Sequence, residues 1–267
     1  FFPTKHGKEK AVATAFSEIL DIKIEAIKAD TDALGTFSGE IERTGSPLAT
    51  AIAKTDLVRD QGNLFIASEG TVGPDPSNPF LISDVELLIF RDIERNIVIR
   101  ESHRSFDIKA QRIEIYPGSD LDEFLHKADF PHHSLIAKGN SLKTTKPIKG
   151  ISDRDHLDKA IEEIAKSSPV VILENDLRAD QSPSRMANIE IAARKLALRV
   201  HELCPACSTP GFGQIDVTRG VYCSECKELN PDAPHRELLG CVLCPEKREG
   251  AILHPELPAE RCIFCNP

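Results

Sequence analysis

The sequence predicts an α/β protein, with a mixed sheet and flanking helices, followed by a small C-terminal double zinc ribbon. Two observations lead to this prediction. The first 203 residues alternate between segments with strand and helix periodicity, and they contain no cysteine. All eight cysteines lie between positions 204 and 265. We therefore expect an α/β domain over residues 1–203 and a Cys-rich domain over residues 204–267.

Local patterns predict the elements of the first domain. Residues 6–20 have the pattern of a turn that leads into an amphipathic helix, and Ser46-Pro47 provides a capped start for a second helix. Residues 64–67 predict a short buried strand that ends before Glu69. The remaining predicted elements are a hairpin over 85–90 and 96–101, a helix over 153–166, a strand over 170–173 and a long helix over 184–203.

The charge balance narrows the classes of partner. The chain has 33 Lys and Arg against 42 Asp and Glu, and its formal net charge is -9, which argues against a nucleic-acid partner. No run of about 18 uncharged apolar residues occurs, which argues against a membrane span. No signal-peptide pattern follows Phe1, and we expect a cytoplasmic protein with reduced thiols.

The cysteines form four Cys-x-x-Cys steps, which are Cys204/Cys207, Cys223/Cys226, Cys241/Cys244 and Cys262/Cys265. Each step places two sulfurs on one side of a tight turn, and two such turns supply the four thiolates of a tetrahedral Zn²⁺ site. The sequence therefore predicts two structural zinc ions. The alternative is a set of disulfides, which the regular spacing and the expected reducing compartment disfavour.

The spacing of the four steps permits three ways of pairing them. Sequential pairing, in which the first step joins the second and the third joins the fourth, gives two ordinary ribbons and is the arrangement we favour. A nested scheme and an interleaved scheme are also open. In each case the site is closed, so the metal stabilises a segment with few large apolar residues and performs no chemistry. Residues 204–267 are acidic, so a protein contact is expected of them more than a DNA contact.

Two polar segments near the N-terminus are candidates for ligand binding. His6-Gly7-Lys8-Glu9 opens the first helix, where a glycine turn, a lysine and free amide groups suit a phosphate. Glu40 and Arg43 follow a glycine-flanked turn and would share one helical face, although a surface ion pair explains the same spacing.

Two further segments follow predicted strands. Glu69 comes after the apolar residues 64–67 and before a Gly/Pro loop. This position suits a carboxylate that binds a metal ion or acts as a general base. Asp176, Arg178 and Arg185 lie between a strand and the long helix, where arginines bind phosphate or carboxylate groups in a bidentate manner. The alternative is that these arginines only tie the acids of their own loop together.

The motifs HGKE at 6–9, GTFSGEIER at 35–43, ASEGTVGP at 67–74 and DLRA at 176–179, with the Cys-rich tail, resemble an uncharacterised bacterial family known only as a domain of unknown function. This resemblance spans nearly the whole chain and implies no activity.

The N-terminal half is more distantly similar to nucleotide pyrophosphatases of the inosine triphosphatase and Maf type. That resemblance implies that Lys8 contacts phosphate and that Glu40 and Glu69 hold Mg²⁺. His6 stands where those enzymes have an Asn, only one acid follows the strand, and the Cys-rich tail is foreign to them.

These inferences lead to two hypotheses about function. The first is Mg²⁺-assisted hydrolysis of a nucleotide-like phosphate compound, with Glu69 and Glu40 as catalytic carboxylates. His6, Lys8, Glu9, Arg43, Asp176, Arg178 and Arg185 would bind the ligand. The second is a non-enzymatic adaptor whose zinc ribbons bind another protein.

Overall fold

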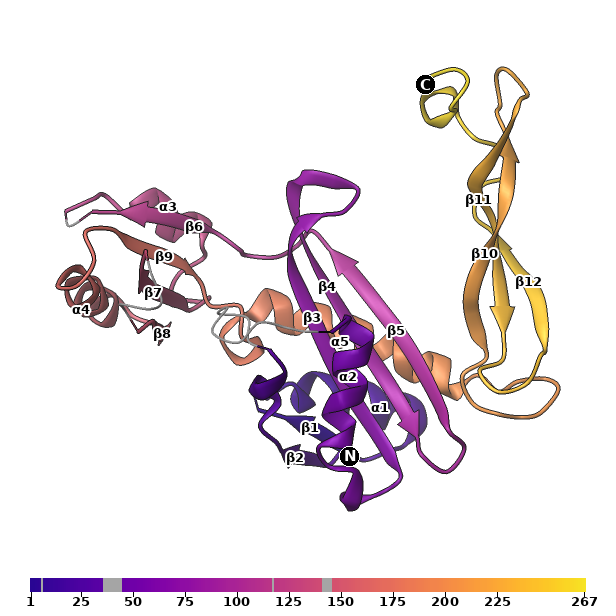
Figure 1. Ribbon diagram of the computed structural model, residues 1–267, viewed down its shortest axis with the longest axis horizontal. Coiled ribbons are helices and arrows are strands. Elements are labelled where there is room, and N and C mark those ends of the chain that lie inside the picture. The colour runs from indigo at the N-terminus through magenta and orange to yellow at the C-terminus, as the bar shows by residue number, and fades with distance from the viewer. Residues whose placement is uncertain (6, 36–44, 117, 141–145) are drawn as a thin grey trace. The chain divides into compact units, whose positions relative to one another are not determined.

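The computed structural model describes residues 1–5, 7–35, 45–116, 118–140 and 146–267 (Figure 1). Three predicted ligand or catalytic residues, His6, Glu40 and Arg43, lie outside the described residues. The chain divides into two units, which we describe separately. Unit 1 comprises Phe1–Asn96 and Arg100–Ala197, and unit 2 comprises Ile97–Ile99 and Leu198–Pro267.

Unit 1 begins with a parallel pair of short strands, β1 (Phe2–Thr4) and β2 (Ala26–Lys28), which are connected through helix α1 (Glu9–Leu20). The amide of Ile66 donates to the carbonyl oxygen of Phe1 at 2.8 Å, and the amino group of Phe1 donates to the carbonyl oxygen of Leu64 at 2.9 Å. These bonds place β1 beside β3, so that the turn after β1 comes close to the middle of β3.

The main sheet of unit 1 is antiparallel and has the order β3-β4-β5, with bounds Leu64–Asp75, Asn78–Asp92 and Ile97–Ser105. Helix α2 (Pro47–Asp56) crosses in front of β3 and β4 in Figure 1, and α5 (Pro183–His201) passes behind them. The predicted start of α2 is confirmed, because the Ser46 hydroxyl accepts from the amide of Ala49 at 3.2 Å. The predicted end of the strand at residue 67 is wrong, because β3 continues through Glu69 to Asp75.

A smaller four-stranded antiparallel sheet has the order β6-β9-β7-β8. Its strands are β6 (Arg112–Ile115), β7 (Leu135–Gly139), β8 (Ile148–Ile151) and β9 (Val171–Asn175), and it is accompanied by helices α3 (Asp122–Lys127) and α4 (Arg154–Ala165). The buried side chains of this region include Phe124, Leu135, Leu157 and Leu173, which form one apolar core. Helix α4 starts as predicted, because the carboxylate of Asp153 accepts from the amide of His156 at 2.7 Å.

Unit 2 contains a three-stranded antiparallel sheet with the order β10-β11-β12, formed by Gly213–Tyr222, Leu229–Gly240 and Lys247–Ile252. One apolar cluster in this unit consists of Val221, Cys223, Leu257 and Cys262, so two of its four buried members are cysteines. The described residues of both units also include the short 3-10 helices η1 (Thr31–Leu34), η2 (Arg59–Gln61), η3 (Ala179–Gln181) and η4 (Ala259–Arg261). Within the described ranges, no helix is long and apolar enough to cross a membrane.

Candidate metal centres and a buried ion cluster

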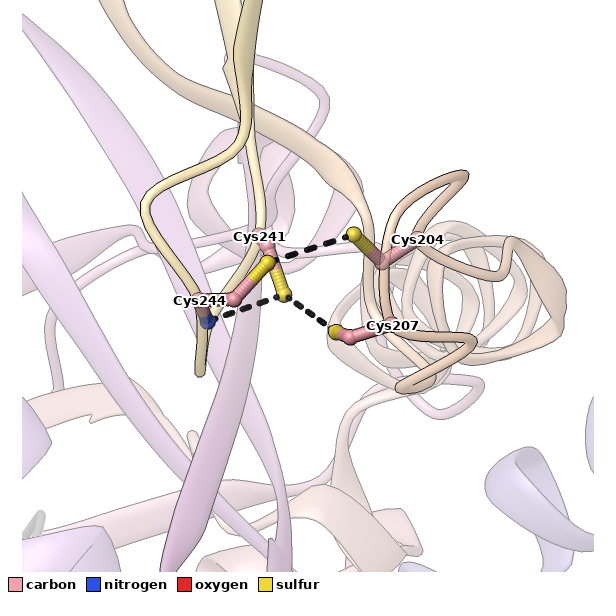
Figure 2. A group of neighbouring side chains, drawn as sticks. All are labelled: Cys204, Cys207, Cys241 and Cys244. Carbon is pink, nitrogen blue, oxygen red and sulfur yellow. Dashed lines mark hydrogen bonds between the residues drawn. The ribbon is translucent and has the colours of Figure 1, made fainter.

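The first metal centre combines the first and third Cys-x-x-Cys steps. Figure 2 shows the side chains of Cys204 and Cys207 pointing toward those of Cys241 and Cys244, which come from a different loop. The Sγ atoms of Cys204 and Cys244 are 3.6 Å apart, and those of Cys207 and Cys241 are also 3.6 Å apart. All four sulfurs lie within 4.8 Å of one another.

The second metal centre combines the second and fourth steps. The Sγ atoms of Cys223 and Cys265 are 3.8 Å apart, and those of Cys226 and Cys262 are 3.7 Å apart. The Asn230 side chain donates to Cys262 Sγ at 3.5 Å and so joins β11 to this centre. The amide of Phe264 donates to the same sulfur at 3.4 Å.

The sulfur geometry fits zinc. A tetrahedral Zn²⁺ ion with Zn–S bonds of about 2.3 Å separates its sulfurs by about 3.8 Å. The observed separations are close to this value, whereas a disulfide requires about 2 Å, and none of the eight cysteines is disulfide-bonded. Four thiolates leave no open coordination position, so each centre is of the structural type.

The favoured sequential pairing of the cysteines is wrong, and the interleaved pairing is observed. Cys204 and Cys207 precede the start of β10, whereas Cys223 and Cys226 follow its end. The 10 residues of β10 therefore separate these two steps, by about 30 Å at the rise of an extended strand. Gly213 pairs with Gly240, which brings the start of β10 beside the Cys241/Cys244 turn instead.

In unit 1, five charged side chains from five segments gather at Ser68–Gly70 of β3. We call this set, Lys8, Lys54, Glu69, Glu86 and Arg185, the ion cluster. Lys54 of α2 donates to the carboxylate of Glu69 and, at 2.8 Å, to the carbonyl oxygen of Ser68. Lys8, at the start of α1, donates to the hydroxyl of Ser68 at 3.2 Å. Ser68 thus links the two lysines.

The two carboxylates of the ion cluster lie on opposite faces of the sheet. Glu69 pairs with Leu87 in the β3–β4 register, whereas Glu86 pairs with Gly70, and neighbouring residues of a strand point to opposite sides. Arg185 of α5 donates to Glu86 Oε1 at 2.5 Å and to the carbonyl oxygen of Leu177 at 2.5 Å. The Arg185 and Glu86 side chains are 1% and 0% exposed. A Cβ atom at position 70 would lie 2.5 Å from Glu86 Oε1, so this ion pair requires glycine there.

Burial changes the ionisation of two groups in this region. Burial lowers the pKa of Lys8 to about 7, and the charges of Arg185 and Lys54 lower it further, against the opposite effects of Glu86 and Glu69. Burial, assisted by the neighbouring charge of Glu86, raises the pKa of Asp84 to about 7. Asn188 of α5 donates to Asp84 Oδ2 at 2.9 Å. Near neutral pH, Lys8 is therefore close to losing its charge.

The predicted residues Asp176 and Arg178 bind each other, as the alternative interpretation of this loop expected. Arg178 Nε donates to Asp176 Oδ1 at 2.9 Å, and the amide of Gly150 donates to Asp176 Oδ2 at 3.0 Å. The loop nevertheless touches the ion cluster, because its middle residue Leu177 accepts from Arg185. Glu9 does not join the cluster by any hydrogen bond among the described residues, where its buried Oε2 atom has no partner.

A cavity of about 530 Å³ adjoins this loop. Its lining includes Val72 and Gly73, which follow Glu69 on β3, and the loop residues Asp176, Leu177 and Arg178. Apolar side chains and the Lys138–Glu174 ion pair, with its 2.5 Å separation, line other parts of the wall. The volume falls within the range of small-molecule sites.

The sequence patterns indicated Lys8, Glu69 and Arg185, which the structure brings into one region, but they did not indicate Lys54 and Glu86. A signal for Glu86 was present, because Asp84, Glu86, Leu88 and Phe90 alternate on one face of a predicted strand. Two acids on the same strand face as two buried apolar residues indicate a buried ionic contact. Lys54 lacks such a signal, since a lysine near the end of an amphipathic helix is usually solvated.

The fold and its sites define an α/β protein that carries two four-cysteine clusters suited to structural zinc. The chain belongs to the family described as "Domain of unknown function (DUF6671)", which it matches over residues 54–267. The match includes all eight cysteines, Lys54, Glu69, Glu86 and Arg185, whereas Lys8 precedes it. The predicted membership of an uncharacterised family is confirmed. No curated protein and no solved structure matches the chain.

Proposed function

We propose that unit 1 binds a small phosphorylated ligand at the ion cluster and hydrolyses it. One observation carries this proposal: Lys8, Lys54 and Arg185, from three distant parts of the sequence, converge on Ser68–Gly70. Leu177, which accepts from Arg185, also lines a cavity of ligand size. Two carboxylates accompany the three cations, and phosphate oxygens would balance the remaining positive charge. Cationic groups fixed in this way stabilise the charge that develops on phosphate during hydrolysis.

The described carboxylates do not by themselves form a Mg²⁺ site. Glu69 and Glu86 are bonded to cations on opposite faces of the sheet, and the part of the chain that the structure describes contains no group of three nearby carboxylates. Mg²⁺ commonly enters a site with the phosphates of its ligand and uses only one or two protein carboxylates. In our proposal Glu69 is one of these carboxylates, and Lys8, which donates to the neighbouring Ser68, holds a phosphate oxygen.

A panel of nucleoside di- and triphosphates with and without Mg²⁺ tests this proposal. We expect turnover of at least one compound, and a loss of roughly 100-fold or more in kcat/KM for Glu69→Gln and Lys8→Met, because each removes a charge that contacts the ligand or its cation. Lys10→Met is the matched control, since Lys10 lies on the same helix and is exposed. Turnover and binding should both weaken as the pH rises from 6 to 8, because the pKa of Lys8 is about 7 and the neutral amine attracts phosphate less.

Absence of both turnover and calorimetric binding across the panel would reject the hydrolase. Activity that persists in Lys8→Met with an unchanged pH dependence would show that the ligand binds elsewhere.

The adaptor function is our second candidate, because both metal centres carry exposed apolar side chains. Leu243 is 57% exposed between Cys241 and Cys244, and Phe264 is 55% exposed between Cys262 and Cys265. Unit 2 is acidic, and each tetrathiolate zinc centre adds a formal charge of about -2. A partner with an apolar surface surrounded by basic groups would complement it.

For the adaptor, we expect the Leu243→Ser/Phe264→Ser variant to lose a partner that the wild-type chain retains in pull-downs, while both proteins keep two zinc ions. Ile252→Ser is the control, because Ile252 is an exposed apolar residue at the end of β12 that pairs with Arg236 of β11, away from the cysteine turns. Equal retention of every partner by the variant would remove this candidate.

A further inference from the structure

Three side chains of unit 1 that the proposed phosphate site does not use form a hydrogen-bonded relay. His133 Nδ1 lies 2.9 Å from Asp129 Oδ2, and His133 Nε2 lies 2.9 Å from the hydroxyl oxygen of Ser184. Asp129 and His133 come from the turn that follows α3, and Ser184 lies in the first turn of α5. Nothing in the local sequence of His133 indicates a contact with a serine 51 residues away.

The surrounding hydrogen bonds fix the tautomer of His133. The backbone amide of Ser184 donates to His133 Nε2 at 3.1 Å, so Nε2 carries a lone pair. The imidazole proton then resides on Nδ1, where Asp129 accepts it. The Nε2 lone pair is shared between the amide and the hydroxyl of Ser184, and the imidazole is in the neutral tautomer that a general base requires.

The environment of Ser184 favours the anionic form of its oxygen. The amide of Lys109 donates to Ser184 Oγ at 3.3 Å. Ser184 also sits at the N-terminal end of α5, a helix of 19 residues, whose dipole stabilises negative charge there. His133 is buried with 3% exposure, whereas Ser184 is only half-buried and so remains accessible to a reagent.

We propose that Ser184 is a nucleophile for acyl transfer from a small carboxylic ester, a second activity that is independent of the proposed phosphate hydrolysis. Ser184 Oγ forms a bond to the acyl carbon while its proton passes to His133 Nε2. The bond to the leaving alcohol then breaks, and His133 returns the proton to that alcohol. Water hydrolyses the acyl-serine by the same steps. Asp129 acts as a positioning residue that holds the imidazole.

The same turn also offers an arrangement for a metal ion, since ligand atoms of Asp129, His132 and His133 lie within 4.8 Å of one another. Metal at His133 Nδ1 would move the imidazole proton to Nε2, where it would meet the amide proton of Ser184. This hydrogen bond therefore favours the nucleophile over the metal site.

A fluorophosphonate probe tests the proposal on the full-length zinc-loaded chain. The probe forms an Oγ–P bond with an activated serine and releases fluoride, so mass spectrometry should locate it on Ser184. We expect no labelling of Ser184→Ala, and a labelling rate lower by about 10²–10⁴ for His133→Gln, the range that a general base contributes. Ser182→Ala should label at the wild-type rate, because Ser182 is buried and its hydroxyl has no partner among the described residues.

The pH dependence of labelling separates catalysis from a structural role of Asp129. Burial lowers the pKa of His133 most, and the charges of His132 and Lys109, which face the ring, lower this pKa further. Asp129 has the opposite effect and raises it. Labelling should therefore fall as the pH drops through a midpoint below about 6.5, the ordinary value for histidine. In Asp129→Asn the midpoint should move lower still, because the neighbouring negative charge is lost.

Wild-type labelling no faster than that of Ser184→Ala or of heat-denatured chain would overturn the proposal. A third metal ion per chain that is lost in His132→Ala would overturn it as well, because it would show that the turn binds metal instead.

Discussion

The double variant Cys204→Ser/Cys244→Ser should retain one zinc ion per chain, whereas Cys204→Ser/Cys223→Ser should retain none. Both variants lose two thiols, but the first removes them from a single centre and the second takes one from each. Sequential pairing would give the opposite result. Metal content by mass spectrometry of purified, reduced chain therefore tests both the presence of zinc and the interleaved pairing.

Loss of both zinc ions in Cys204→Ser/Cys223→Ser should destabilise unit 2 more than any other substitution that we predict. Structural zinc contributes apparent folding energies of about 10–16 kcal/mol in small domains, and unit 2 has few apolar residues to replace it. We expect Cys204→Ser/Cys223→Ser to lose the strand signal of unit 2 in circular dichroism, as should wild-type chain treated with a strong chelator. A chain without bound zinc that keeps this signal would refute a structural role for the metal.

Arg185→Met should lower the free energy of unfolding of unit 1 by about 3–5 kcal/mol, because it leaves the charge of Glu86 buried without its partner. The double variant Arg185→Met/Glu86→Met should recover most of this loss, since no unpaired charge then remains. Urea denaturation followed by circular dichroism measures both values.

Arg194→Met is the matched control for this prediction. Arg194 lies on the same helix, and its ion pair with Glu18 has side chains that are 52% and 54% exposed. Such a surface pair contributes about 0–1 kcal/mol. If Arg185→Met costs no more than Arg194→Met, the Arg185–Glu86 pair does not stabilise unit 1.

Local signals predicted the starts of α2 and α4 and the number of four-cysteine clusters correctly, because each depends on adjacent residues. Ser46 and Asp153 cap helices within one turn, and a Cys-x-x-Cys step brings its two sulfurs together in any fold. The α/β class followed in the same way from the periodicity of segments such as residues 154–165 and 171–175.

Features that depend on strand pairing could not be predicted in this way. Gly70, Gly73 and Pro74 suggested a loop, but β3 continues through them because its partner β4 extends alongside. Proline is tolerated there since β3 is at an edge of the three-stranded sheet. Likewise, the cysteine turns that meet are set by the length of β10 and its pairing with β11. The relay of Asp129, His133 and Ser184 forms only when α5 packs against the turn after α3.

The interleaved cysteines have a consequence for synthesis on the ribosome. A nascent chain that has emerged as far as residue 226 already offers zinc the four thiolates of Cys204, Cys207, Cys223 and Cys226, with a spacing that zinc accepts. Neither native centre can close until Cys241 and Cys244 emerge. Premature capture of the ion would hold the start and end of β10 together and oppose its extension. Delivery of zinc after translation, or exchange of thiolates at the bound ion, avoids this kinetic trap.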